Sequence, residues 1–217
     1  MSIKNQLFFI FLLSQNLAMS QSDTLKEATI LANWANNNTP MAFDNVSKKA
    51  LQKNNLGQDM PYLLQQLPSV IASSDAGTGI GYTNLRVRGT DATRINVTIN
   101  GVPLNDAESQ AVYWVNLPDF ATSVSNVQLQ RGVGTSTNGA GAFGATLNLN
   151  TSQMYEKPYA TLTATAGSFG TRKANLQFGT GLLNEHFTFD ARVSKIHSDG
   201  YIQRATANLD SWFTFID

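Results

Sequence analysis

The sequence has no cysteine and only two histidines, and Asp, Glu, Lys and Arg together make up 14% of its 217 residues. Without cysteine the chain has no disulfide and no thiolate metal site. His186 and His197 have no partner at the spacing of a zinc motif, so each is interpreted as an ordinary strand-end or loop residue. The formal net charge is zero, so no basic field favours nucleic acid as a partner.

Long apolar runs are also missing. Residues 1–20 carry the positive Lys4, an apolar run from Leu7 to Leu13 and the small-x-small end Ala18-Met19-Ser20, which together predict a secretory signal peptide. The apolar run breaks at Ser14 and is too short for a membrane-spanning helix, which needs about 20 apolar residues. We therefore expect an exported protein.

Polar residues dominate residues 21–45, where Asn is frequent and large apolar side chains are few. Such a segment buries too little surface to offset its chain entropy, so we expect it to be flexible. It contains one stretch without Pro or Gly, from Thr24 to Ala32, that can form a strand. A strand-forming stretch on a flexible tether can add to the edge of a partner's sheet. The alternative, an ordinary disordered leader, stays open at this point.

Residues 46–152 are predicted to form a compact domain of short strands and helices. Ser47 is an N-cap candidate for a helix that ends at Lys53, and Asp59 for a second helix over 60–67. Asn100-Gly101 predicts a tight turn, because both residues accept the positive φ that such turns need. Apolar and polar residues alternate at period two, as in half-buried strands, over 85–89, 95–104, 124–132 and 143–150.

Two glycine-rich loops lie in the same region, at 77–81 and 132–144. The first is not set between a strand and a helix, and the second lacks the Gly-Lys-Ser/Thr step that cradles phosphate. Nucleotide binding is therefore not expected. Small residues bury little area, so the second loop is expected either to open cheaply or to allow close packing against a neighbouring wall.

Residues 153–217 have a different sequence pattern from the residues before them. Stretches of about 10 residues place apolar side chains on one face and polar side chains on the other, and they are joined by alternately short and longer loops. This pattern is typical of transmembrane β-barrel strands, although a soluble β-sandwich gives a similar alternation. Aromatic residues suited to a membrane interface lie near the ends of these stretches: Tyr155, Tyr159, Phe169, Tyr201 and Trp212.

The order of these motifs resembles TonB-dependent outer-membrane receptors of the iron-complex (siderophore) type. The resemblance covers the whole chain and rests on Leu64-x-x-Leu67-Pro68-Ser69-Val70, Leu85-Arg86-Val87-Arg88-Gly89, Ile99-Asn100-Gly101-Val102-Pro103-Leu104, Val127-x-x-x-Arg131-Gly132 and Gly141-Ala142-Phe143-Gly144-Ala145. It implies an α+β plug domain of mixed short strands and helices inside a transmembrane antiparallel β-barrel of about 22 strands. Since the chain holds too few strands to close such a barrel, we expect an N-terminal fragment of a longer receptor.

The resemblance also implies active import across the outer membrane, energised by the periplasmic domain of TonB. The imported ligand is expected to be a ferric siderophore or another iron complex, because Ser198-Asp199-Gly200-Tyr201 is similar to a loop of iron-complex receptors. Cobalamin or another solute is the alternative ligand within the family. Outer-membrane lipid is an expected partner, and no cofactor or metal site of the protein's own is expected.

Three groups of site residues follow from the resemblance. Arg86, Arg88 and Arg131 are expected to face the barrel lumen and pair with wall carboxylates. Thr90, Asp91, Tyr113 and Trp114 are candidate ligand contacts, with the alternative that Tyr113 and Trp114 are buried packing residues. The candidate TonB-interacting segment, which departs from the family pattern by an internal Lys-Glu pair, consists of Thr24, Leu25, Lys26, Glu27, Ala28, Thr29, Ile30, Leu31 and Ala32.

Two other classes of protein are alternatives. An enzyme could use the carboxylates of Asp91, Asp106, Glu108 and Asp119, but carboxylates without a geometry do not make an active site, and no nucleophile motif is present. An enzyme is therefore not expected. A secreted structural or adhesive β-protein would need neither a TonB-binding segment nor a plug-like glycine-rich run.

The first prediction concerns export. Because residues 1–20 have the three regions of a signal peptide, we expect the mature protein to begin at or near Gln21. N-terminal sequencing of protein purified from the outer membrane measures this directly, and an intact Met1 would show the interpretation to be wrong.

Overall fold

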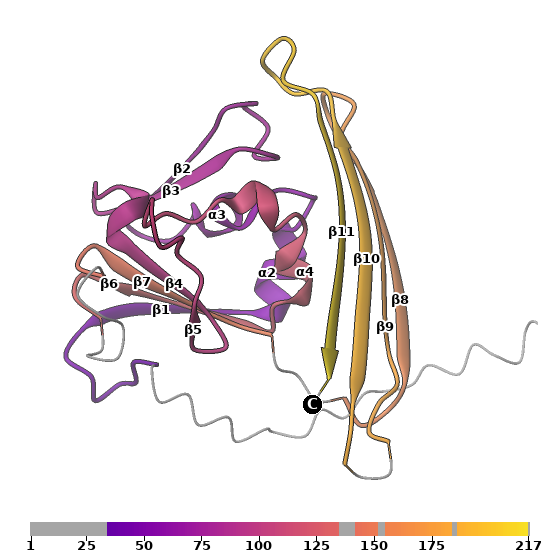
Figure 1. Cartoon of the computed structure of the whole chain (residues 1–217), viewed down its shortest axis with the longest axis horizontal. Helices are drawn as coiled ribbons and strands as arrows, with labels where there is room; N and C mark the ends of the chain where they lie inside the picture. Colours follow the sequence, from indigo (N-terminus) through magenta and orange to yellow (C-terminus); the bar gives the residue numbers. More distant parts are fainter. Residues whose placement is uncertain (1–33, 135–141, 152–154, 184–185, 217) are drawn as a thin grey trace, which may run out of the picture.

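The computed structural model describes residues 34–134, 142–151, 155–183 and 186–216. Figure 1 shows two parts side by side, an α+β domain and a tall antiparallel sheet. Residues 34–151 are called the plug below, and residues 155–216 the wall. The predicted signal peptide and the candidate segment Thr24–Ala32 lie outside the described residues.

The plug is built on a 5-stranded sheet in the order β1-β6-β7-β4-β5. Its strands are β1 (Ala42–Ser47), β4 (Ile95–Ile99), β5 (Val102–Pro103), β6 (Asn126–Arg131) and β7 (Ala145–Asn150). Neighbours are antiparallel except for β4 and β7, which pair in parallel. A separate hairpin joins β2 (Val70–Ser74) to β3 (Thr83–Val87).

The predicted turn at Asn100-Gly101 joins β4 to β5. Both residues have positive φ, 51° and 82°, as the tight hairpin turn requires. The Asn100 side chain donates to Thr151 Oγ1 at 2.8 Å, and the Thr151 N–H donates to Asn100 Oδ1 at 2.9 Å. These two bonds tie the turn to the end of β7.

Short helices cover one face of the plug sheet. They are α2 (Lys48–Asn54), α3 (Met60–Leu64) and α4 (Phe120–Ser123), with the 3-10 turns η1 (Ala92–Arg94) and η2 (Trp114–Asn116). Between helices and sheet lies a single apolar cluster whose fully buried members include Leu51, Leu64, Leu85, Val87, Val124, Leu129, Leu147 and Leu149. Burying a Leu or Val side chain stabilises a fold by about 1.5–3 kcal/mol, so this cluster holds the plug together from within.

Two predicted boundaries differ from the structure. Residues 42–45, assigned to the flexible segment, belong to β1, because hydrogen bonding to the edge of β6 stabilises a strand that composition alone does not reveal. The predicted helix over 60–67 ends at Leu64, and its N-cap Asp59 makes no side-chain capping bond. The carboxylate of Asp59 instead accepts from Thr83 Oγ1 at 2.9 Å, so it joins α3 to β3. Ser47 does cap α2, as predicted, accepting from Ala50 N at 3.4 Å.

The wall is a 4-stranded antiparallel sheet in the order β11-β10-β9-β8. The strands are β8 (Tyr159–Ala166), β9 (Arg172–Gly179), β10 (Phe189–Ser198) and β11 (Ala207–Ile216). The predicted alternation is confirmed in β8 to β10, where one face exposes Leu162, Leu176, Phe178 and Val193. It is not followed in β11, where the exposed positions mix Trp212 and Ile216 with polar residues, and Leu209, Phe213 and Phe215 lie on the less exposed face. Among the described residues, no helix is long and apolar enough to cross a membrane.

Asp59 gives the plug a pH-dependent stability. The side chain is only 2% exposed, and burial raises the pKa of Asp59 from 3.8 to about 7, although hydrogen bonds from Thr83 and Gly81 oppose the rise. The folded plug therefore keeps a proton on Asp59 that the unfolded chain has already lost. Stability is greatest below about pH 4 for this group and falls as pH rises towards 7.

The second prediction is that the free energy of unfolding of a plug fragment, residues 34–151, falls between pH 5 and pH 8. Over this range the loss from Asp59 is on the order of 3 kcal/mol at most, since only the two units between pH 5 and the folded-state pKa of about 7 contribute and one unit corresponds to about 1.4 kcal/mol. Urea unfolding at several pH values measures it. Asp59→Asn should remove most of the loss, whereas Asp75→Asn, a change of an exposed carboxylate, should leave it in place. If the free energy of unfolding of Asp59→Asn fell with pH as steeply as that of the wild type, Asp59 would not be the cause of the pH dependence.

Candidate functional site: the contact between plug and wall

Asp119 occupies the N-cap of α4 and points from the plug into the wall. Its φ of +54° lies in the left-handed region, which Asp and Asn tolerate better than most other non-glycine residues. Pro118 precedes it, and Phe120 follows as a buried core residue. The turn between them leaves Asp119 1% exposed and directed at the polar face of β9 and β10.

The carboxylate of Asp119 is held by two wall cations. Lys173 Nζ lies 2.5 Å from Oδ1, and Arg192 Nη1 lies 3.4 Å from Oδ2. Asn175 Nδ2 donates to Oδ2 at 2.8 Å, and the Ser194 hydroxyl donates to the same oxygen. Asp119, Lys173, Asn175, Arg192 and Ser194 are called the anchor cluster below. All five residues are at most 4% exposed.

Sheet geometry brings the wall members of the anchor cluster together. Successive side chains of a strand point to opposite faces, so residues two apart share a face. Lys173 and Asn175 are two apart on β9, and Arg192 and Ser194 are two apart on β10. Asn175 lies directly opposite Ser194 in the register of the two strands, and its amide donates to the Ser194 hydroxyl at 2.5 Å.

The electrostatics of the cluster favour an ionised Asp119. Burial by itself would raise the pKa of Asp119, but the charge of Lys173 and the hydrogen bonds from Lys173, Ser194 and Thr122 outweigh it and hold the pKa below the usual value. The charge pair is therefore lost only in strong acid, as pH falls through that lowered pKa. Asn55 shares the site, because Lys173 Nζ also donates to Asn55 Oδ1 at 3.1 Å.

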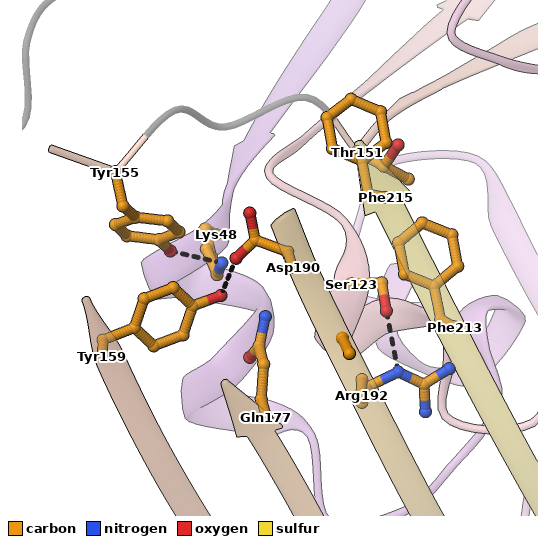
Figure 2. Close-up of a pocket in the computed structure, with 11 residues that line it drawn as sticks. Lys48, Ser123, Thr151, Tyr155, Tyr159, Gln177, Asp190, Arg192, Phe213 and Phe215 are labelled. Atoms are coloured by element: carbon orange, nitrogen blue, oxygen red, sulfur yellow. Dashed lines mark hydrogen bonds between the residues drawn. The ribbon is translucent and has the colours of Figure 1, made fainter. Parts of the chain in front are cut away.

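A second contact lies beside the anchor cluster (Figure 2). Lys48 of α2 donates to the Tyr155 hydroxyl at 2.7 Å, and the Tyr159 hydroxyl donates to Asp190. Between this pair and Arg192 is a cavity of about 20 Å³, room for about one water molecule. On its other side, Arg192 Nε donates to Ser123 Oγ at 2.7 Å. Polar contacts therefore make up most of this side of the interface.

The loop between β2 and β3 contacts the opposite end of the wall. The N–H groups of Tyr201 and Ile202 donate to Ala76 O at 2.8 and 3.3 Å, and the Phe169 and Tyr201 rings meet edge to face at 5.4 Å. Two cavities of about 280 and 310 Å³ lie on either side of this loop, against the β8–β9 turn and the start of β11. The Ser198–Tyr201 motif therefore lies where plug and wall meet.

Of the three arginines expected to pair with the wall, Arg131 has its contacts within the plug. Arg131 forms an ion pair with Asp44 and donates to Pro68 O at 3.0 Å, so both of these partners belong to the plug. Arg86 and Arg88 are exposed, and no ion pair joins them to a carboxylate in the described part of the chain. The pairing of Arg86 and Arg88 with wall carboxylates stays a prediction, and it concerns wall strands other than β8 to β11.

The structure also separates the candidate ligand contacts. Trp114 is 3% exposed and belongs to the apolar cluster, which agrees with the alternative that it is a buried packing residue. Tyr113, in contrast, is 50% exposed. Thr90 donates its hydroxyl to Val87 O at 2.7 Å, and the exposed Asp91 caps η1 by accepting from Thr93 N at 2.9 Å. Tyr113, Thr90 and Asp91 stay predictions, and a role for Trp114 in ligand contact has no support in its position.

Sequence reasoning missed the anchor cluster. The plug supplies the carboxylate and the wall supplies the cations, which reverses the expected direction of pairing. A signal was present: Lys173 and Arg192 stand at inner-face positions of two amphipathic strands, where an unpaired charge would be costly. Their partner could not be found from sequence, because Asp119 is 54 residues from Lys173.

A small α+β domain seated against the polar face of amphipathic antiparallel strands is the arrangement of a plugged outer-membrane barrel. The sequence model described as TonB-dependent Receptor Plug Domain matches residues 35–146. This match spans more than half of the chain. The chain therefore belongs to the TonB-dependent receptor family. Because receptors of this family are transport proteins of the outer membrane, the chain is not an enzyme.

Solved structures of such receptors share the fold at low sequence identity. The ferripyoverdine receptor of the outer membrane of Pseudomonas aeruginosa matches 82% of this chain with a TM-score of 0.65 and 15% identity. The ferric yersiniabactin uptake receptor FyuA from Yersinia pestis matches 81% with a TM-score of 0.62 and 13% identity. The copper transporter OprC matches 80% with a TM-score of 0.60 and 16% identity.

The chain spans about a quarter of the length of the structures that it matches, 23% of the ferripyoverdine receptor and 28% of FyuA and of OprC. The shared part contains a plug and the start of a wall. At these identities the likeness establishes the fold, and it assigns no ligand to this chain.

The third prediction concerns Asp119→Asn in the full-length protein. Asn keeps the shape and tolerates the left-handed backbone, but it leaves Lys173 and Arg192 buried without a counter-charge. Removing one partner from a buried pair costs about 3–5 kcal/mol. We expect the plug to be cleaved by an added protease at least tenfold faster in outer-membrane vesicles.

Asp106→Asn is the matched control. It removes the same charge from an exposed plug loop, where the carboxylate accepts from Glu108 and Ser109 of its own turn. Its cleavage rate should stay close to that of the wild type. Equal rates for Asp119→Asn and wild type would mean that the cluster does not hold the plug.

Proposed function

We propose that the chain forms the plug and the first wall strands of an importer that takes up a scarce metal complex, most simply a ferric siderophore. The observation that carries this proposal is the chemistry of the contact between plug and wall. Apart from Phe213, which packs against the plug core, the described contacts between plug and wall are mainly hydrogen bonds and ion pairs. Such contacts close a passage but can be exchanged for water when the plug moves.

The ligand class rests on the relatives. Two of the matched structures are named for ferric complexes, ferripyoverdine and ferric yersiniabactin, and a third for copper. The plug's exposed aromatic side chains, Tyr82 at 63% and Tyr113 at 50%, are suited to contact a large, partly apolar complex. Thr90 and Asp91 are polar candidates for the same role. Cobalamin or another solute is the alternative ligand.

Energy for import must come from a partner, because the outer membrane holds neither ATP nor a sustained ion gradient. We propose that the periplasmic domain of TonB supplies it by adding a strand to the segment from Thr24 to Ala32. This segment lies just ahead of Ala35, where the match to the family begins. The predicted signal peptide accounts for export to the outer membrane.

The fourth prediction is that Ile30→Pro abolishes uptake in the full-length receptor. Proline removes a backbone donor and fixes φ, so it disrupts a strand whose contacts are made by the backbone. Radiolabelled ferric siderophore uptake measures the effect. Binding of the complex at the cell surface should persist, since the substitution is far from the outer loops in the sequence.

Ile30→Ala is the matched control, because it shortens the side chain and leaves the backbone donor in place. Uptake should then fall by less than about threefold, a change worth less than about 0.7 kcal/mol. Normal transport by Ile30→Pro would place the coupling segment elsewhere in the chain.

A further inference from the structure

The side chain of Gln128 holds the main chain at Ala35. The Ala35 N–H donates to Gln128 Oε1 at 2.7 Å, and Gln128 Nε2 donates to Ala35 O at 2.9 Å. The two residues are 93 positions apart in the sequence. Ala35 is 6% exposed and Gln128 is 1% exposed, so both bonds are shielded from water.

This pair of bonds, called the Gln128 clamp below, reproduces a strand pairing. A carboxamide carries the same donor and acceptor as a peptide unit, so its two bonds to one residue imitate the exchange between paired strands. Two neighbours fix the amide in place. Gln128 Nε2 also donates to Asn45 Oδ1 at 2.8 Å, and Gln130 Nε2 donates to Gln128 Oε1 at 2.8 Å.

Ala35 and β1 are attached to the same strand at separate points. Gln128 belongs to β6, and β1 pairs with β6 from Ala42 onwards. Between them, residues 36–41 form a largely exposed turn in which Thr39 N donates to Asn36 O at 2.8 Å. If the Gln128 clamp opens, this turn becomes slack chain ahead of the sheet.

We propose that the Gln128 clamp is the point at which a pull on the N-terminal segment first loads the plug. The inference rests on the proposed function for the origin of the pull, a partner on residues 24–32. A pull from that side meets Ala35 before any residue of β1. Gln128 passes the load to β6, the strand that follows α4 and therefore Asp119 of the anchor cluster. Gln128 is thus a positioning residue that couples the tether to the anchored part of the plug.

Pulling on the single full-length receptor tests the proposal. The protein is held in outer-membrane vesicles on a surface and drawn by its mature N-terminus with a force probe, without ligand or partner. In the wild type, the first force peak should mark the Gln128 clamp. In Gln128→Leu the first peak should mark β1, seven residues later (35 to 42), which adds about 24 Å of extended chain before the peak at about 3.3–3.6 Å per residue.

Two further variants keep the test decisive. Gln128→Asn retains a polar amide but is one methylene shorter, so it cannot reach Ala35, and it should give the same added length. Thr98→Val removes another buried side-chain bond of this sheet, from Thr98 Oγ1 to Asn148 Oδ1 at 2.9 Å, and should leave the first peak where the wild type has it. A first peak at the same extension in wild type and both Gln128 variants would overturn the proposal. So would an equal shift in Thr98→Val.

Uptake measured on the same variants separates this inference from the proposed function. With the Gln128 clamp open, added slack should lower ferric siderophore uptake several-fold while surface binding is unchanged. Absence of uptake in the wild type would refute the proposed function, and the force peaks would still decide for or against the clamp. A shifted peak with uptake equal to the wild type would overturn the coupling role of Gln128.

Discussion

The pairing of the Asp119 carboxylate with Lys173 and Arg192 is the constraint on which the arrangement of the two parts depends. Each charge is buried, so each requires the others, and together they determine where the plug lies on the wall. A buried ion pair adds little net stability compared with apolar packing, but its geometry is demanding. It specifies one position for the plug and becomes costly only when a single partner is removed.

The distribution of apolar and polar side chains agrees with that constraint. Apolar side chains gather inside the plug and on the outer face of the wall, whereas the surface between the two parts is mainly polar. Phe213 of β11 is an exception, since its ring meets the Phe120 ring at 6.0 Å and extends the plug core onto the wall. The plug can thus remain folded while its contacts with the wall are exchanged. The clamp at Gln128 and the anchor at Asp119 are joined by the short stretch of chain that contains α4.

Local patterns in the sequence predicted much of this fold. The period-two alternation predicted the wall strands and the apolar face of β8 to β10, Asn100-Gly101 predicted the hairpin turn, and Ser47 predicted the start of α2, because each depends on neighbours in the chain. The partners of Asp119, Arg131 and Gln128 depend on contacts between residues 54 to 93 positions apart, which one sequence does not encode locally. Trp114 shows the same limit, since whether an aromatic residue near a loop is buried is decided by the packing around it.

The direction of β1 has a mechanical consequence. In Figure 1, β1 lies along the lower side of the plug, and it is antiparallel to β6. The hydrogen bonds of such a pair lie perpendicular to the strands, so a force that draws the Ala42 end of β1 away from β6 acts along the bonds. It peels β1 from its Ala42 end, breaking the bonds one after another instead of shearing all of them together. Bonds loaded in succession yield at a lower force than bonds loaded in parallel, and a strand removed in this way can zip back in the same register once the force ends.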